Sequence, residues 1–448
     1  MIKDLTVGDP GKTLISFTLP LFASVVFQQL YSIADSVIAG KYAGENALAA
    51  VGASYPITMI FMAVAFGCQI GCSVVISRFF GAGRLEEVKT CITTSLISGL
   101  VLSSVMTVLG VLFSPQMMRL VKTPDNIMND GNIYLKIYTG GFVFLFVYNV
   151  ITGIFNSLGD SRTPLVFLII SSLGNIVLDA VFVIMFKWGV AGVAWATFIA
   201  QGVSCLLSGA VLLKRVRSIE TENKPAVFSR DALKDIVRVA VPSVLQQSFV
   251  SVGNMFIQAM VNGFGSSVIA GYSAAIKLNT FALTGFSTFG NGISSFTAQN
   301  TGAGKPDRIK LGVRAGLALS LSTAVFFTVT YLIFGRQLLG LFMNKDSSVL
   351  ALETGFDFMR ITAPFYAVIC AKLLCDGVLR GSECMNHFMA ATFTDLIMRV
   401  VLAFIFSTLM GKAVGIWSAW PVSWATAAVM SCGFYLKGVW RKKGFSEQ

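Results

Sequence analysis

The sequence predicts an all-α polytopic membrane protein with twelve transmembrane helices in two pseudo-symmetric six-helix lobes. Three observations lead to this fold class. Only 12% of the 448 residues are charged, whereas a soluble protein needs roughly 25% to cover its surface. Apolar runs of about 20 residues recur along the whole chain. The two halves of the chain also resemble each other.

The apolar runs lack the alternation of β-strands, which excludes an outer-membrane barrel. Because a backbone in lipid must satisfy its own hydrogen bonds, each run is predicted to be a helix. The predicted spans are Leu14–Gly40, Leu48–Ile76, Cys91–Phe113, Ile133–Ser157, Pro164–Phe186, Val190–Leu213, Ile236–Phe264, Val268–Ala298, Leu311–Phe334, Phe356–Val378, Phe388–Met410 and Val414–Leu436.

The net charge of +12 follows the predicted membrane topology. With both termini placed in the cytoplasm, 22 of the 34 Lys and Arg residues lie on the cytoplasmic side and eight on the outer side. This is the positive-inside bias, and it fixes the orientation of the chain. No interleaving of aromatic and basic residues indicates a nucleic-acid partner, and none is predicted.

An internal repeat defines the domains. The polar stretch 214–235 is predicted to be a cytoplasmic linker between the lobes 1–213 and 236–448. Two lobes of the same orientation predict a pseudo-two-fold axis along the membrane normal and a central cavity, one way of building alternating access. The repeated positions are Gly44, Gly52 and Ser54 with Gly263, Gly271 and Ser273, Gly81–Gly83 with Gly302–Gly304, Gly159 with Gly381, Gly192 with Gly415, and Pro20 with Pro242.

Four charged residues of the second lobe fall into two pairs at helical spacing. Lys372 and Asp376 are four residues apart, and so are Asp395 and Arg399. Residues at this spacing face each other on a helix and can neutralise one another. The favoured interpretation is therefore two structural pairs, each within one helix.

Asp35 and Asp179 have no basic neighbour three or four residues away. Since a charge in the bilayer costs several kcal/mol, each is expected to face the bundle interior or a wet cavity. Two carboxylates with amide and hydroxyl neighbours can share a proton or bind sodium. At the matching positions the second half has Asn254 and an apolar residue, Val401 or Leu402, so the fold itself does not require acids there.

Other polar residues are candidates for the substrate cavity. Lys277 stands alone in its predicted helix, where it either meets a partner across the cavity or extends to the membrane surface. The polar face of the seventh span either lines the cavity or joins helices by hydrogen bonds. The candidate cavity residues are Gln28, Gln201, Gln247, Asn254 and Lys277.

Enzyme motifs are missing from the sequence. No Walker A motif is present, and the only histidine, His387, cannot form a His-based catalytic or metal cluster. We expect no enzymatic activity, no resident metal and no organic cofactor. Transport is then driven by an ion gradient or runs downhill.

The sequence resembles the multidrug and toxic compound extrusion (MATE) transporters, in particular the DinF-like branch. The likeness rests on Pro20 and Asp35 in the first span, the run Asn175–Asp179 in the fifth, the Gly-Ala-Gly loops and the two six-helix halves. It implies a V-shaped protein of the bacterial cytoplasmic membrane. Carried over to this sequence, the cation-coupling residues are Asp35, Asn149, Asn175, Asp179 and Thr197, and Pro20 is the point where the first helix kinks.

The resemblance implies export of bulky, often cationic, drug-like compounds in exchange for protons or sodium. The sequence leaves open both the compound and the ion. A two-lobed bundle of this kind can work as a monomer. Two other functions remain as alternatives: a flippase for lipid-linked precursors from the same wider superfamily, and a passive channel or membrane-embedded enzyme.

Overall fold

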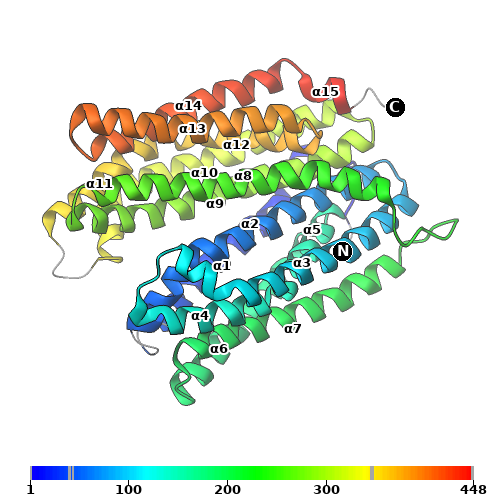
Figure 1. Cartoon of the computed structure of the whole chain (residues 1–448). Helices are drawn as coiled ribbons and strands as arrows, with labels where there is room; N and C mark the ends of the chain where they lie inside the picture. The colour runs from blue at the N-terminus through cyan, green and yellow to red at the C-terminus, as the bar shows by residue number, and fades with distance from the viewer. Residues whose placement is uncertain (1–2, 39–41, 43–44, 344–347, 445–448) are drawn as a thin grey trace. The chain divides into compact units, whose positions relative to one another are not determined.

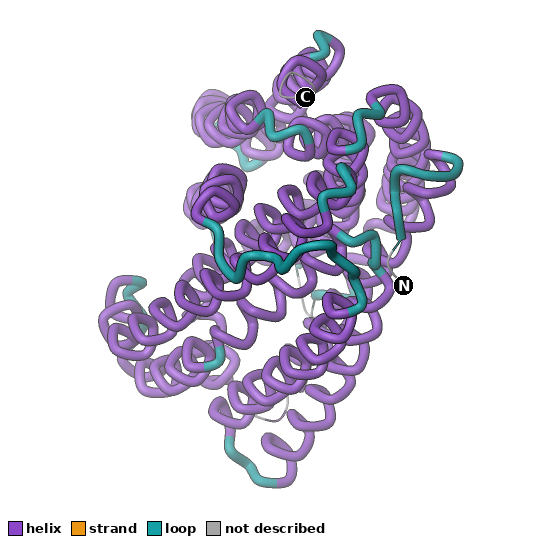
Figure 2. The backbone as a smooth tube through the Cα atoms, turned by 90° about the vertical axis from the view of Figure 1, so that its right-hand side faces the viewer, coloured by secondary structure: helices purple, strands orange, loops and turns teal. Residues whose placement is uncertain are grey.

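The computed structural model describes residues 3–38, 42, 45–343 and 348–444, without the side chains of residues 33–37, 45, 46, 48 and 442–444. Every regular element in this described part is helical (Figure 2). The chain divides into two compact units, considered one at a time below. The first contains residues 1–4 and 19–248, and the second contains residues 5–18 and 249–448.

The helices follow one another closely along the chain (Figure 1). They are α1 (Pro10–Ile38), α2 (Glu45–Gly81), α3 (Leu85–Leu120), α4 (Asp125–Gly140), α5 (Phe142–Ser157), α6 (Arg162–Asp179), the π-helical turn η2 (Ala180–Met185), α7 (Gly189–Arg217), α8 (Arg230–Asn262), α9 (Ser266–Gly302), α10 (Pro306–Gly340), α11 (Val349–Thr362), the 3₁₀ turn η3 (Ala363–Phe365), α12 (Tyr366–Gly381), α13 (Met385–Met410), α14 (Val414–Leu436) and α15 (Val439–Gly444).

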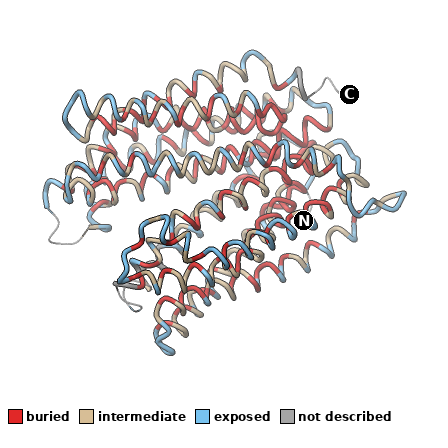
Figure 3. Tube along the Cα trace, in the orientation of Figure 1, coloured by how far each residue is buried: buried red, intermediate tan, exposed pale blue. Residues whose placement is uncertain are grey.

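Nine of the described helical segments are long and apolar enough to cross a membrane, or ten if α4 and α5 count as one span bent by 45°. The remaining two predicted spans are the described helices α9 and α14. Helix α9 is less apolar because it runs through the protein interior: every residue from Gly292 to Gly302 is buried. Figure 3 colours the chain by burial and shows buried turns (red) alternating with exposed ones (pale blue) along many helices. Helix α14 is helical over Val414–Leu436, and three of its tryptophans are fully buried.

In the first unit, α2 packs against α3, α4, α5 and α7. It also lies very close to the first part of α8. A Cβ atom on Gly71 would stand 2.7 Å from Cβ of Ala240 and 2.9 Å from its backbone nitrogen, and one on Gly67 would stand 2.6 Å from the backbone nitrogen of Val244. The two glycines therefore allow two helix backbones to touch.

In the second unit, α9 packs against α10, α11 and α12, while α13 pairs with α14. The close helix contact of the first unit recurs here. A Cβ atom on Gly292 would stand 2.5 Å from Oγ1 of Thr18, a residue of α1. Gly292 follows Gly71 by 221 positions and Ala240 follows Thr18 by 222, so the two contacts are repeats of each other. In each half, the start of the first helix belongs to the unit formed mainly by the other half.

Side chains of the second unit hold the segment that precedes α1. Gln299 accepts a hydrogen bond from the Leu5 amide at 2.9 Å, and Asn300 donates to the Leu5 carbonyl at 3.3 Å. Arg308 donates to the carbonyl oxygens of Val7 and Gly8 at 3.0 and 2.6 Å. The entry into α1 is thus fixed mainly through its backbone.

The linker before α8 is fixed in a similar way within the first unit. Glu86 accepts hydrogen bonds from the backbone and side chain of Asn223, and Arg78 pairs with Asp235 at 2.7 Å. The non-helical linker covers only residues 218–229, shorter than the predicted 214–235, because α7 continues to Arg217 and α8 begins at Arg230.

Aromatic side chains fill the core of the second unit. The Tyr272 ring stacks on Trp417 with centroids 5.1 Å apart, and Phe358 meets Trp417 and Trp420 edge-on. Trp417, Trp420 and Trp424 are at most 1% exposed. This packing ties α9 and α11 to α14.

The contact of α2 with α8 is testable by adding one methyl group. Gly71→Ala places that group against the backbone of Ala240, and overpacking of this kind costs about 1–3 kcal/mol. We expect a lower thermal unfolding temperature in detergent. The matched control is Gly174→Ala in α6, where nothing lies within 4 Å of the new Cβ. Because Ala stabilises a helix relative to Gly, the control should match or exceed wild type, and equal behaviour of the two variants would contradict the contact.

Asp160, in the loop before α6, allows a test by pH. Burial raises the pKa of this carboxyl, but hydrogen bonds, including two from Thr163, lower it below the ordinary 3.8. Because the folded pKa is the lower one, the stabilisation is present above about pH 4 and is lost as the pH falls through the folded pKa. Asp160→Ala should cost about 1 kcal/mol at pH 7, the usual value of a helix cap. Thermal melts should show this difference narrowing below pH 4; a constant difference would refute it.

Candidate functional site

Two buried polar side chains of the first unit lie near the point where α6 ends and the π-helical turn η2 begins. Asn175 and Asp179 are one turn apart on α6 and are 2% and 0% exposed. Neither the amide nitrogen nor the amide oxygen of Asn175 has a hydrogen-bond partner in the described structure. Short π-helical turns are rare and often occur at functional sites.

An apolar cluster joins α1, α4, η2 and α7 next to these residues. Val183 and Val193 pack together, and Ile38 and Tyr134 pack against them. Asp179 precedes Val183 by four residues. Thr197 follows Val193 by four residues on the oppositely directed α7, so both lie about 6 Å from the cluster in the same direction along the bundle.

Position 35 lies three residues before Ile38 on α1, which runs in the same direction as α6. The helix therefore carries this position to about the same level as Asp179 and Thr197. The Asp35 side chain falls outside the described residues. Three of the five predicted cation-coupling positions, 35, 179 and 197, thus lie at about the same level along the helix axes. Asn175 lies one turn earlier on α6.

Asn149 is placed elsewhere along the bundle. It lies two residues before Ile151, whose Cδ1 atom is 3.6 Å from the position that a Cβ on Gly209 would take. Gly209 is twelve residues beyond Thr197 on α7, or about 18 Å along the axis. Asn149 is buried, and its amide nitrogen donates a hydrogen bond to the Leu145 carbonyl at 2.8 Å, so its place in the cation-coupling set stays a prediction.

The hydrogen bonds of the aligned residues leave oxygen atoms available as acceptors. The Thr197 hydroxyl donates to the Val193 carbonyl at 3.1 Å, so its oxygen can still accept or coordinate. A carboxylate, an amide oxygen and a hydroxyl oxygen are hard ligands that suit a proton or a small alkali cation. In the described residues no group of three His, Cys, Asp or Glu side chains could hold a metal ion.

The second unit contains the repeat of this region, and its register corrects the sequence alignment. Gly159 was matched with Gly381, but its structural equivalent is Glu383. Both Gly159 and Glu383 adopt positive φ, 72° and 59°, in turns with the same hydrogen-bond pattern. A left-handed turn position, rather than a shared glycine, marks the repeat.

The corrected register places residues of the second half 224 positions after those of the first. It also holds at Phe182 and Phe406, which are 224 positions apart and whose backbones lie against Gly192 and Gly415; these two glycines are themselves 223 positions apart. Asp179 therefore corresponds to the fully buried Ala403, so both predicted matches, Val401 and Leu402, were wrong by one or two residues.

The four charged residues of the second unit pair across helices as well as within one. Lys372 Nζ lies 2.9 Å from Oδ2 of Asp376 and 3.8 Å from Oδ2 of Asp395 on α13. The predicted pair of Asp395 with Arg399 does not form: in the described structure no ion pair joins them within 4.0 Å, and the Arg399 guanidinium lies over the Trp420 ring at 4.7 Å. The two acids thus share one ammonium group.

The candidate cavity residues are divided between the units. Gln28, Gln201 and Gln247 belong to the first, and Asn254 and Lys277 belong to the second. Lys277 is exposed, with its ammonium 5.8 Å from the ring of Phe342, beyond the end of α10. This position agrees with a side chain that extends along the helix toward the membrane surface.

Pro20 lies inside α1, which continues without a break from Pro10 to Ile38. Its carbonyl accepts a hydrogen bond from the Ser24 hydroxyl at 2.9 Å. The division between the two units falls between residues 18 and 19, next to this proline. The kink at Pro20 stays a prediction.

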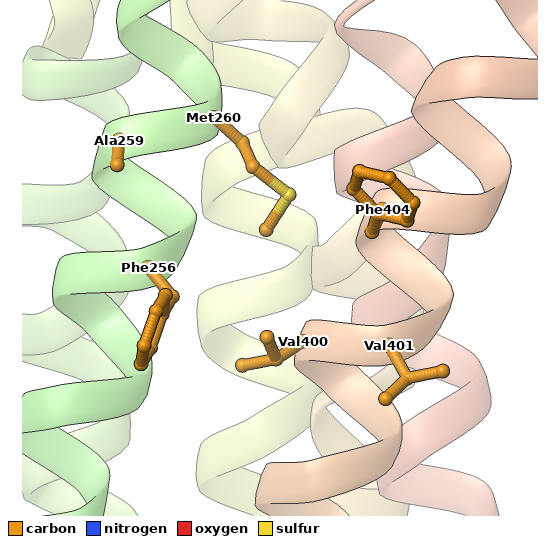
Figure 4. Close-up of a pocket in the computed structure, with 6 residues that line it drawn as sticks. All are labelled: Phe256, Ala259, Met260, Val400, Val401 and Phe404. Atoms are coloured by element: carbon orange, nitrogen blue, oxygen red, sulfur yellow. The ribbon is translucent and has the colours of Figure 1, made fainter.

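A cavity of about 480 Å³ in the second unit was not foreseen from the sequence. Its lining is apolar and comes from α8 and α13 (Figure 4). None of the five candidate cavity residues lines it. The only available signal was the spacing of large apolar residues on the two helices, which is also common on lipid-facing surfaces. The lining residues are Phe256, Ala259, Met260, Val400, Val401 and Phe404.

Comparison with known proteins gives a consistent family. The MatE family profile matches residues 20–181 and 242–405. A probable multidrug resistance protein of Bacillus subtilis, YoeA, is 27% identical over 95% of this chain and 93% of its own length. A FAD transporter of Shewanella oneidensis is also 27% identical, over 76% of each chain.

Solved structures show the same fold. A MATE protein in complex with MaL6 superposes with a TM-score of 0.92, at 23% identity, over 98% of this chain and 99% of the other. A MOP superfamily transporter from Pyrococcus furiosus superposes with a TM-score of 0.91, also at 23% identity, over 98% and 97%.

The unpartnered amide of Asn175 leads to a stability prediction. Leaving a buried polar group without a hydrogen bond costs about 1–3 kcal/mol, so Asn175→Leu should raise the thermal unfolding temperature in a sodium-free buffer. A residue kept only for stability would give the opposite result. Ser172→Ala, at a buried position on the same helix, is the control for a general effect of removing polar atoms. A lower unfolding temperature for Asn175→Leu would contradict the prediction.

Proposed function

This chain belongs to the MATE family of multidrug efflux transporters, and on that premise we propose that it exchanges protons or sodium for bulky, often cationic, organic compounds. MATE proteins are transporters, and the apolar helices make this one a multi-pass membrane protein. The proposed coupling site lies in the first unit and comprises Asp35, Asn175, Asp179 and Thr197. Asn149 belongs to the predicted set and is also buried in the first unit.

The observation that carries the proposal is the burial of Asp179 beside Asn175, an amide without a hydrogen-bond partner in the described structure. Natural proteins rarely leave such a group unsatisfied, and those that do often use it for function. A cation held beside the carboxylate and coordinated by the Asn175 amide oxygen would give that oxygen a partner.

The second unit supports the same assignment by contrast. Its acids, Asp376 and Asp395, already share the ammonium group of Lys372. Where the first unit has Asp179, the second has Ala403, and the offset of 222 between Thr18 and Ala240 puts Ile257, in place of the predicted Asn254, at the position of Asp35. An exchangeable cation is therefore favoured only in the first unit.

In the proposed cycle, binding of the cation at the first-unit site favours one conformation of α1, which bends near Pro20 and releases the compound outward. Loss of the ion on the cytoplasmic side restores the conformation that takes up a new compound. A ligand shifts such an equilibrium only by its different affinity for the two states. The carboxylates supply this difference because their charge changes with ion binding.

The substrate class is proposed more broadly than one dye. Relatives are named as multidrug resistance proteins and, in one case, as a FAD transporter, so both cationic and anionic aromatic compounds are suitable probes. A flippase of lipid-linked precursors is the second candidate. It would not require ion-driven movement of soluble dyes.

The test is dye efflux from cells or everted vesicles with imposed pH or sodium gradients. Asp179→Asn and Asp35→Asn should each reduce gradient-driven efflux at least tenfold, because the carboxylate that exchanges the cation is gone. Asp125→Asn, at an exposed position of the same unit, should transport as wild type. The gradient that drives wild-type efflux identifies the ion.

If both variants show wild-type efflux at equal amounts of inserted protein, the proposed coupling site is wrong. Absence of gradient-driven efflux in wild type, with any dye and with FAD, would instead remove the antiport function and leave the flippase.

A further inference from the structure

The charged cluster of the second unit is buried. Lys372, Asp376 and Asp395 have side chains 3%, 4% and 8% exposed. Asp376 Oδ1 accepts a hydrogen bond from Ser431 on α14, while Asp395 Oδ1 has no hydrogen-bond partner among the described residues. Lys372 Nζ thus stands between two carboxylate oxygens from α12 and α13.

The repeat register shows what this cluster replaces. At 224 positions earlier, Lys372 and Asp376 correspond to Tyr148 and Thr152, which share a hydrogen bond. Asp395 corresponds to Ser171 on α6, about two turns before Asp179. The second half thus has two acids and one ammonium group in the region where the first half has the proposed cation site.

The ammonium group itself has the properties of a bound cation. It carries one positive charge, it is buried, and it approaches a carboxylate oxygen from each of two helices. Unlike an ion, it is covalently attached and cannot leave. Burying two carboxylates without such a charge would cost several kcal/mol each.

Other basic groups of the second unit do not share this role. Arg399 lies over Trp420, and Arg380 donates to Asn291 Oδ1 at 2.7 Å. In the described structure neither arginine comes within 4.0 Å of the Asp376 or Asp395 carboxylate. Their charge acts on the acids only from a longer range.

We propose that Lys372 is a tethered cation that permanently fills a second monovalent-cation site, formed by Asp376, Asp395 and Ser431. Removing the ammonium group should leave two buried carboxylates that recruit sodium or a proton from solution. In the native protein the charge of the second-unit cluster therefore stays fixed while the first unit binds and releases its ion. The inference rests on the proposed function only for that last contrast; the site itself can be tested without transport.

The experiment measures thermal unfolding of the purified full-length protein in the Asp179→Asn background, which removes the first-unit carboxylate. In this background, the unfolding temperature of Lys372→Met should rise by about 2–4 °C when sodium chloride replaces choline chloride at pH 8. The same rise should follow acidification at constant salt. Both are expected when a ligand binds only the folded state. The background protein alone should show neither response. Lys372→Arg keeps the charge and should also show neither.

A charge-restoring variant separates cation binding from general damage. Lys372→Met combined with Asp395→Asn removes one charge of each sign, so the gained ion response should disappear. If Lys372→Met alone gives no folded protein, this double variant should recover it. No recovery, no ion response in folded Lys372→Met, or the same response in the background protein would each overturn the proposal.

The efflux test of Asp179→Asn and the unfolding test of Lys372→Met can fail independently of each other. Loss of the antiport function would leave the ion response of Lys372→Met unchanged, whereas a failed ion response would leave the first-unit coupling site standing.

Discussion

A carboxylate inside an apolar helix bundle needs a positive charge close by, because removing it from water costs far more than its hydrogen bonds return. The two halves of this chain meet that requirement differently. In the second unit Lys372 supplies the charge to Asp376 and Asp395. In the first unit Asp179 is buried beside Asn175, whose amide atoms have no hydrogen-bond partner among the described residues. That contrast makes one half suited to exchanging an ion and the other suited to staying fixed.

The helices that open each half connect the two units through their packing. The start of α1 packs on Gly292 in the second unit, and the start of α8 packs on Gly67 and Gly71 in the first. The later part of each helix belongs to the other unit. A change in the conformation of either helix therefore affects the packing of both units. For this reason the position of Pro20 within α1 matters for the proposed cycle.

Much of the fold follows from the sequence because apolar length and charge asymmetry are imposed by the bilayer. All twelve predicted spans correspond to described helices or helix pairs. The repeat was also readable, but its register was not. Glycine was used as the marker, whereas Glu383 adopts the left-handed turn that Gly159 occupies in the first half. Local propensity favours glycine there without requiring it.

The candidate site was predictable only in part. Asp179 and Thr197 lie near one level, with Asn175 one turn away, because helical spacing and helix direction determine these positions. Asn149 was grouped with them by resemblance, and no spacing rule within one helix could place it relative to α7. The pairing of Lys372 with Asp395 was missed for the same reason, since it joins two helices. Contacts between helices depend on side-chain packing that a single sequence does not reveal.

The aromatic core of the second unit has a spectroscopic consequence. Four of the six tryptophans, Trp417, Trp420, Trp424 and Trp440, are fully buried in that unit, whereas Trp188 and Trp195 in the first are 50% and 40% exposed. Collisional quenchers will reach Trp188 and Trp195 far more easily than the four buried tryptophans. Intrinsic fluorescence can therefore be separated, without any label, into a quenchable signal from the first unit and a shielded signal from the second.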